Sequence, residues 1–171
     1  MEKGFIQLYT GNGKGKTSAA FGMALRAAMA GKKVYIAQFV KSMKYSETRI
    51  ETLLENITIE QFGRGCYLNR DVDDADRQAA REGLQQCQQA LRSGDWDLLI
   101  LDEVTIALHF ELFSTAELLR VLDEKATRTE VILTGRYAPQ ELIDRADLVT
   151  EMVENKHYYS QGVLSRPGFD C

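Results

Sequence analysis

Short apolar segments alternate along this chain with longer segments whose apolar residues recur at helical spacing. The spacing predicts strands at residues 5–9, 34–40, 57–62, 98–101, 131–134 and 148–153. It predicts helices at residues 16–30, 46–55, 73–93, 114–125 and 139–145. Strict alternation of strand and helix is typical of an α/β fold, in which helices flank a mostly parallel sheet.

A glycine-rich run follows the first predicted strand and opens the first helix. It reads Thr10-Gly11-Asn12-Gly13-Lys14-Gly15-Lys16-Thr17. Glycines allow consecutive backbone N–H groups to face an anion, and the helix N-terminus adds positive potential. In such loops the last lysine reaches the outer phosphates and the hydroxyl binds Mg²⁺. The run therefore predicts a nucleoside triphosphate site, although Thr10 stands where the pattern usually has glycine.

The composition indicates which broad class of protein this is: globular, nucleic-acid-binding, membrane-spanning or secreted. The chain has 171 residues, with 44% hydrophobic and 27% charged residues, and we expect a single globular domain over residues 1–171. A net charge of -4 argues against a broad nucleic-acid surface. No apolar run approaches the length of a membrane span, and no signal peptide precedes the first strand. Three scattered cysteines fit a reducing cytosol, which predicts a cytoplasmic protein.

Two further polar clusters follow predicted strands. Asp102 and Glu103 end the strand at 98–101, where a carboxylate beside the phosphate loop would hold Mg²⁺ directly or through water. Arg136 follows the strand at 131–134 and offers a fork of donors to phosphate oxygens, or alternatively is a surface arginine after a tight turn. Because parallel strands end at one sheet edge, we expect one site there.

The remaining polar residues are less informative. Lys41 and Lys44 follow the second strand and either face an anionic or amide-rich substrate or lie in a solvated loop. His109 lies in an apolar stretch and suits packing, whereas His157 falls near the presumed site edge. No serine or cysteine has a recognisable nucleophile setting. The lack of a candidate protein nucleophile suits a reaction that depends on substrate positioning and charge stabilisation.

Five stretches together resemble one family, the ATP:corrinoid adenosyltransferases built on a phosphate-loop fold, which act on cob(I)alamin or cob(I)yrinic acid a,c-diamide. They cover residues 9–17, 38–41, 101–103, 133–136 and 147–152, the last continuing through 156–157 and 162–163. They occur in family order and span nearly the whole chain. The resemblance implies a phosphate-loop NTPase-like fold with a recombinase-like core.

The resemblance also implies a reaction. Co(I) of a reduced corrinoid attacks the ribose C5′ of ATP and releases inorganic triphosphate, so the substrate itself is the nucleophile. ATP is held reversed relative to ordinary phosphate-loop enzymes. Mg²⁺ or Mn²⁺, a flavoprotein reductant and a homodimer are further expectations. The implied catalytic residues are Lys16, Thr17, Asp102, Glu103 and Arg136. ATP binding falls to Gly11, Asn12, Gly13, Lys14, Gly15, Lys16, Thr17 and Arg136, and the metal ligands are Thr17, Asp102 and Glu103.

The sequence departs from the family after the third strand. Members often carry aromatic residues there that pack under the corrin, but here Cys66 and Leu68 occupy the corresponding positions. The corrinoid-side candidates are therefore Phe62, Cys66, Tyr67, Leu68 and Lys41. A hydrolytic ATPase or small-molecule kinase, and a nucleotide-dependent switch, remain open alternatives that the glycine loop alone would also serve.

Overall fold

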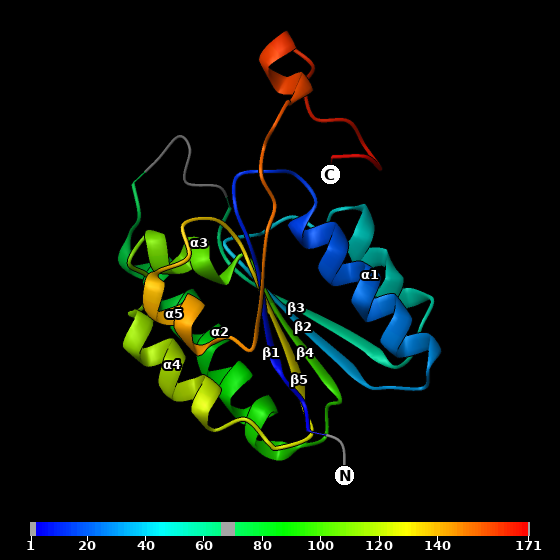
Figure 1. Ribbon diagram of the computed structural model, residues 1–171, viewed down its shortest axis with the longest axis vertical. Coiled ribbons are helices and arrows are strands. Elements are labelled where there is room, and N and C mark those ends of the chain that lie inside the picture. The colour runs from blue at the N-terminus through cyan, green and yellow to red at the C-terminus, as the bar shows by residue number, and fades with distance from the viewer. Residues whose placement is uncertain (1–2, 66–70, 171) are drawn as a thin grey trace.

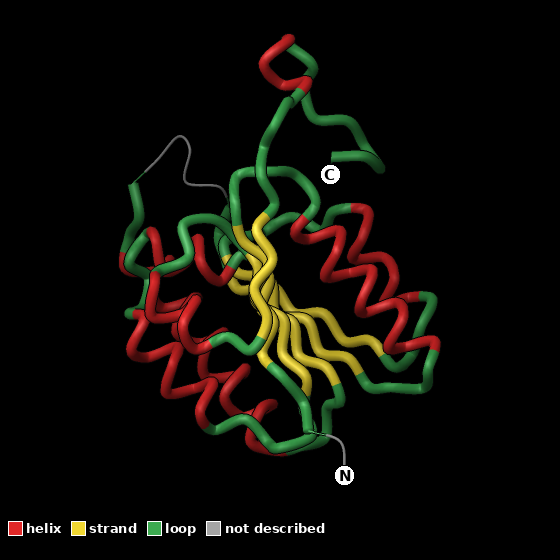
Figure 2. Tube along the Cα trace, viewed as in Figure 1, coloured by secondary structure: helices red, strands yellow, loops and turns green. Residues whose placement is uncertain are grey.

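A computed structural model describes residues 3–65 and 71–170 as a parallel sheet between two layers of helices (Figures 1 and 2). Its strands are β1 (Ile6–Thr10), β2 (Val34–Phe39), β3 (Ile57–Phe62), β4 (Leu98–Asp102), β5 (Glu130–Thr134) and β6 (Leu148–Glu151). Its helices are α1 (Lys16–Met29), α2 (Asp74–Ser93), α3 (Val104–His109), α4 (Thr115–Asp123) and α5 (Gln140–Arg145), with 3₁₀ turns η1 (Ser46–Thr52) and η3 (Tyr158–Gln161).

The order of strands across the sheet is β3-β2-β4-β5-β1-β6, and every pairing is parallel. This confirms the predicted α/β fold and the phosphate-loop NTPase-like arrangement. Because all strands point the same way, β1, β4 and β5 end at the same edge. Tyr9 of β1 pairs with Thr134 of β5, and Gln38 of β2 pairs with Asp102 of β4. The register alone therefore gathers the polar strand ends.

All six predicted strands are confirmed, with ends that differ by a few residues. A capping box begins α4: Glu117 N–H donates to Ser114 Oγ over 3.2 Å, and Ser114 N–H donates to Glu117 Oε2 over 2.7 Å. The segment expected to be helical at 46–55 is a 3₁₀ turn that ends at Thr52. Helix α3 was missed, because six residues directly after a buried strand are too few to show helical periodicity.

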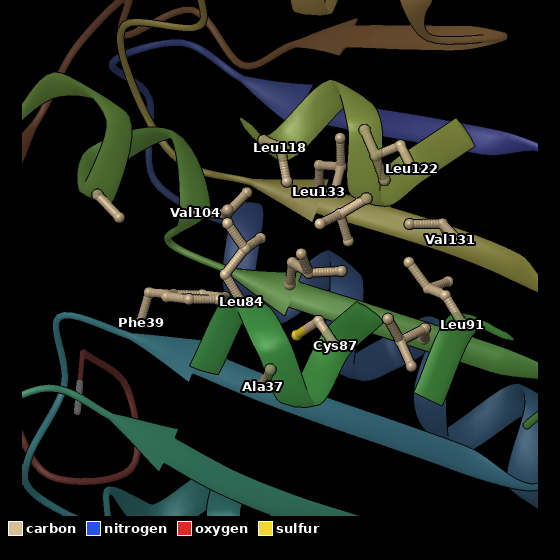
Figure 3. Packing of buried hydrophobic residues seen from close by; sticks show 14 of the residues in the cluster. Ala37, Phe39, Leu84, Cys87, Leu91, Val104, Leu118, Leu122, Val131 and Leu133 are labelled. Atoms are coloured by element: carbon tan, nitrogen blue, oxygen red, sulfur yellow. The ribbon is translucent and has the colours of Figure 1, made fainter. Parts of the chain in front are cut away.

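Two hydrophobic cores lie on the two faces of the sheet. One lies under α1 and includes Phe21, Ile36, Ile100 and Ile132. The other lies under α2, α3, α4 and α5, and Figure 3 shows its centre: Ala37, Phe39, Leu84, Cys87, Leu91, Val104, Leu118, Leu122, Val131 and Leu133. Full burial raises the pKa of the Cys87 thiol, so Cys87 behaves as a packing residue. The central strands β2, β4 and β5 are consequently buried on both faces, as is typical of parallel strands covered by helices.

Gly83 shows how closely α2 approaches the sheet. A Cβ added at this glycine would lie 2.5 Å from Phe62 Cγ, so we expect Gly83→Ala to lower the free energy of unfolding by about 1–3 kcal/mol. Gly22 in α1 is the matched control, since nothing lies within 4 Å of its added Cβ. Gly22→Ala should instead stabilise by up to about 1 kcal/mol. Urea unfolding of both variants checks this, and a stabilised Gly83→Ala protein would contradict the packing.

Candidate active site

The glycine-rich loop joins β1 to α1, as the sequence predicts. Thr10 is the last residue of β1, and the left-handed backbone falls on the next residue, Gly11, with a φ of 99°. Threonine is therefore tolerated at the first position because no positive φ is required there. Gly15, with a φ of 117°, ends the loop immediately before Lys16 begins the helix.

Gly11 and Gly13 also allow a close contact with the segment that follows β6. A Cβ at Gly11 or Gly13 would lie 2.5 Å or 2.6 Å from the carbonyl oxygen of Met152. Gly13 N–H donates to that oxygen over 2.7 Å, and Met152 N–H donates to Thr10 O over 2.8 Å. The segment that follows β6 thus forms one wall of the loop. This contact links two of the five stretches on which the family resemblance rests.

The loop lysine is folded across the loop. Lys16 is buried, and its Nζ donates to the carbonyl oxygen of Gly13 over 2.6 Å. Burial, followed by the neighbouring Arg136, lowers the pKa of Lys16. An anion placed in the loop would offset both effects, because it would give the ammonium group a partner of opposite charge. The Lys16 ammonium is therefore a buried cation held inside the glycine-rich loop.

The carboxylate of Asp102 is fully buried and accepts four hydrogen bonds. Its Oδ1 accepts from Thr17 Oγ1 over 2.8 Å and from Thr134 Oγ1 over 2.7 Å. Its Oδ2 accepts from Gln38 Nε2 over 3.0 Å and from Lys41 Nζ over 2.7 Å. Four donors, from β2, the turn after it, β5 and α1, satisfy a charge that would otherwise be costly to bury. The site is thus built around this one group.

Lys41 reaches Asp102 because the chain turns sharply after β2. Val40 has a φ of 66°, an uncommon value for a β-branched residue. Burial lowers the pKa of Lys41, but the Asp102 carboxylate more than offsets this and the net shift is upward. Lys41 is therefore a charged lysine held against a buried carboxylate. The Nζ atom of Lys41 also lies 3.8 Å from Glu47 Oε1.

Glu103 has a φ of 59°, and its N–H donates to Thr134 Oγ1 over 2.9 Å. Burial, followed by the adjacent Asp102, raises the pKa of its carboxyl group. Arg136 is fixed through its backbone, because Thr105 Oγ1 donates to its carbonyl oxygen over 2.7 Å. Gly135, with a φ of 139°, passes so close to Thr105 that no side chain fits. Thr105 has no motif around it, so sequence reasoning missed it.

Two open cavities border the loop. The first, of about 370 Å³, is lined by Lys16, Glu103, Arg136 and His157 among others. The second, of about 580 Å³, is lined by Phe21, Lys41, Tyr45 and Glu47 among others. Thr17 and Glu103 line both cavities, so the two spaces meet at the acidic strand end. The three polar clusters therefore lie together at one edge of the sheet, around the first cavity.

The predicted metal ligands fit a hard cation. Thr17 and Asp102 lie in direct hydrogen-bond contact, and Glu103 is adjacent in sequence and shares both cavities with Thr17. Hydroxyl and carboxylate oxygens suit Mg²⁺, which keeps waters and phosphate oxygens as its other ligands. Among residues 3–65 and 71–170, no three acidic, histidine or cysteine side chains gather into a protein-only metal site.

The corrinoid-side candidates fall in different places. Phe62 is half-buried and packs against Phe39, with ring centroids 6.1 Å apart. Lys41 lines the second cavity. Cys66, Tyr67 and Leu68 lie outside the described residues. His109, predicted to pack, is exposed, and its ring lies 4.4 Å from that of Tyr137.

Comparison with known proteins decides which phosphate-loop family this site represents. A family model described as ATP:corrinoid adenosyltransferase BtuR/CobO/CobP matches residues 2–171. The chain belongs to this family. A corrinoid adenosyltransferase of Escherichia coli K12 is 34% identical over 99% of this chain and 86% of its own length. The corrinoid adenosyltransferase CobA of Salmonella typhimurium is 33% identical over 99% and 86%, and one from a Sinorhizobium species is 34% identical over 99% and 81%.

Membership of the corrinoid adenosyltransferase family identifies the chain as a transferase whose substrates are ATP and a corrinoid. The alternatives of a kinase, a hydrolytic ATPase and a switch are set aside by a match over the whole chain. None of the helices within the described residues is both long and apolar enough to cross a membrane.

Thr134 allows the network around Asp102 to be tested. Thr134→Val keeps the shape but leaves one oxygen of a buried carboxylate and the N–H of Glu103 without their hydroxyl partner. We expect a loss of about 1–3 kcal/mol in the free energy of unfolding, together with weaker ATP binding. Thr134→Ser keeps the hydroxyl and should retain most of both. Denaturant titration and calorimetry measure the two effects, and a fully stable Thr134→Val protein would contradict the network.

Proposed function

We propose that this chain transfers the 5′-deoxyadenosyl group of ATP to the Co(I) centre of a reduced corrinoid. The first cavity supports this proposal best. It combines the glycine loop, Lys16 and Arg136 in one space, which is the chemistry needed to bind a triphosphate. Residues 1–171 as a whole would form a single domain that binds both the nucleotide and the corrinoid.

In the proposed reaction the cobalt supplies the electron pair. A Co–C bond forms as the bond between C5′ and its oxygen breaks, and that pair leaves with the triphosphate. Cobalt passes formally from Co(I) to Co(III), so no protein nucleophile is needed. Negative charge grows on the departing oxygen. Catalysis by the protein is then orientation and stabilisation of that charge.

The residues divide this task by position. The loop from Gly11 to Thr17, including Asn12 and Lys14, would hold the triphosphate with Lys16 and Arg136. Thr17, Asp102 and Glu103 would hold Mg²⁺ or Mn²⁺. Such an ion, when bound, neutralises phosphate charge as the leaving group departs. Thr17 already donates to Asp102, so its oxygen lone pairs can face the metal while the hydrogen bond persists.

The corrinoid would approach from the β2–β3 side. Lys41 faces the second cavity there and lies beside Tyr45 and Glu47. Phe62 ends β3, the strand next to β2, and the candidates Cys66, Tyr67 and Leu68 come shortly after it in the sequence. A corrinoid on this side would meet the nucleotide where the two cavities join. The carbon to be attacked would then lie near Thr17 and Glu103.

We further propose that the protein is cytoplasmic, works with a flavoprotein reductant and forms a homodimer. The edge strand β6 supports the dimer, because Leu148 and Val149 on opposite sides of the strand are 45% and 41% exposed. Exposed apolar side chains on an edge strand are a liability that a second copy would cover. Sedimentation of the purified chain would reject the dimer if it showed a monomer across micromolar concentrations.

The reaction itself is tested with ATP, Mg²⁺ and chemically reduced cobalamin. The expected products are inorganic triphosphate and a light-sensitive alkyl-cobalt spectrum in equal amounts. Chromatography of the phosphates and the corrinoid absorbance measure them. Release of ADP or orthophosphate with an unchanged corrinoid spectrum would contradict the proposal.

Lys16→Ala tests the leaving-group role. Loss of the ammonium leaves the departing charge unmatched, so we expect turnover to fall by roughly 100-fold or more. Lys44→Ala is the matched control, because Lys44 is bound to Glu51 over 2.8 Å at the surface, outside both cavities. Near-normal turnover of Lys16→Ala in the same assay would reject the assignment.

A further inference from the structure

The segment at residues 157–170 folds back over the phosphate loop, and we refer to it as the strap. In Figure 1 it rises beyond the sheet edge and its end returns toward the loop that precedes α1. Lys14 of the loop lies 2.8 Å from Asp170 Oδ1 and donates to Phe169 O over 2.5 Å. The strap is therefore bound to a residue of the phosphate loop itself.

The strap is also organised internally around the same carboxylate. Arg166 Nε lies 3.0 Å from Asp170 Oδ2, and Tyr158 donates its hydroxyl to Asp170 Oδ1. The Arg166 guanidinium lies over the rings of Tyr158 and Phe169, at 4.8 Å and 5.3 Å from their centroids. Asp170 thus holds the strap together and attaches it to the loop. The Lys14 ammonium, first among several donors, lowers the pKa of Asp170, which is therefore an anion.

Asp170 lines both cavities, including the one that contains Lys16 and Arg136. The negative charge of Asp170 consequently faces the space in which we place the triphosphate. It also forms an ion pair with Lys14, one of the cations of the loop. A triphosphate carries several negative charges, so it repels this carboxylate and competes with it for Lys14. The two anions do not bind Lys14 together without a cost.

We propose that Asp170 is an internal anion that competes with the triphosphate for Lys14, so that nucleotide binding releases the strap from the phosphate loop. This inference rests on the proposed triphosphate site. Asp170 would lower the affinity of the empty loop for anions and keep the site covered until a nucleotide takes Lys14. Release of the strap would then open the region between the two cavities.

Calorimetry with inorganic triphosphate tests this exchange without the complete reaction. Asp170→Asn should bind triphosphate roughly two- to fivefold more tightly than the unaltered protein, the range expected for removing one partly exposed charge pair. Asp144→Asn is the matched control. It makes the same change in net charge on the exposed face of α5, outside both cavities, and should bind as the unaltered protein does. Equal or weaker binding by Asp170→Asn would overturn the inference.

Hydrogen exchange of the unaltered protein gives a second measurement that needs no variant. Triphosphate should speed amide exchange in the strap, whereas slower or unchanged exchange would overturn the inference. The outcomes separate the two proposals. If triphosphate binds equally to the unaltered protein and to Asp170→Asn, the proposed competition between Asp170 and triphosphate is wrong, but the triphosphate site stands. If neither binds triphosphate, the proposed triphosphate site itself fails.

Discussion

The buried carboxylate of Asp102 is the group on which this site depends. A charge without exposure to water must have its oxygens hydrogen-bonded, and here the donors are Gln38, Lys41, Thr17 and Thr134. These donors come from β2, the turn after it, α1 and β5. Satisfying one carboxylate therefore fixes the relative positions of the phosphate loop and three strand ends.

A second constraint is the close approach between the loop and the segment after β6. Gly11 and Gly13 lie directly against the backbone of Met152, and no side chain fits at either glycine. The contact means that the edge strand β6 supports the loop although all four of its residues are exposed. The chain after β6 continues into the strap, whose Asp170 returns to Lys14. The same loop is thus bounded on one side by a fixed wall and on another by a charge pair that an anion can replace.

The distribution of charge fits a reaction in which the protein stabilises a leaving group. Lys16 and Arg136 lie in the first cavity, while Lys41 lies between Asp102 and the second cavity. The burial that lowers the pKa of Lys16 and raises that of Glu103 also strengthens their interaction with any charge placed between them. Family membership supplies the two substrates, and the described residues supply the positioning.

The sequence by itself determined the six strands, the helices α1, α2, α4 and α5, the glycine-rich loop and the acidic strand end, because each depends on local periodicity or on contiguous residues. The sequence also indicated the family, since the five stretches that resemble it occur in the family's order. Only the tertiary structure decided that Thr134 and Gln38 share Asp102, that Gly13 contacts Met152 and that Asp170 binds Lys14. These partners are far apart in the chain. Parallel pairing of strands that are distant in sequence brings together the partners in and beside the sheet, and the return of the strap brings Asp170 to Lys14. No local pattern encodes these contacts.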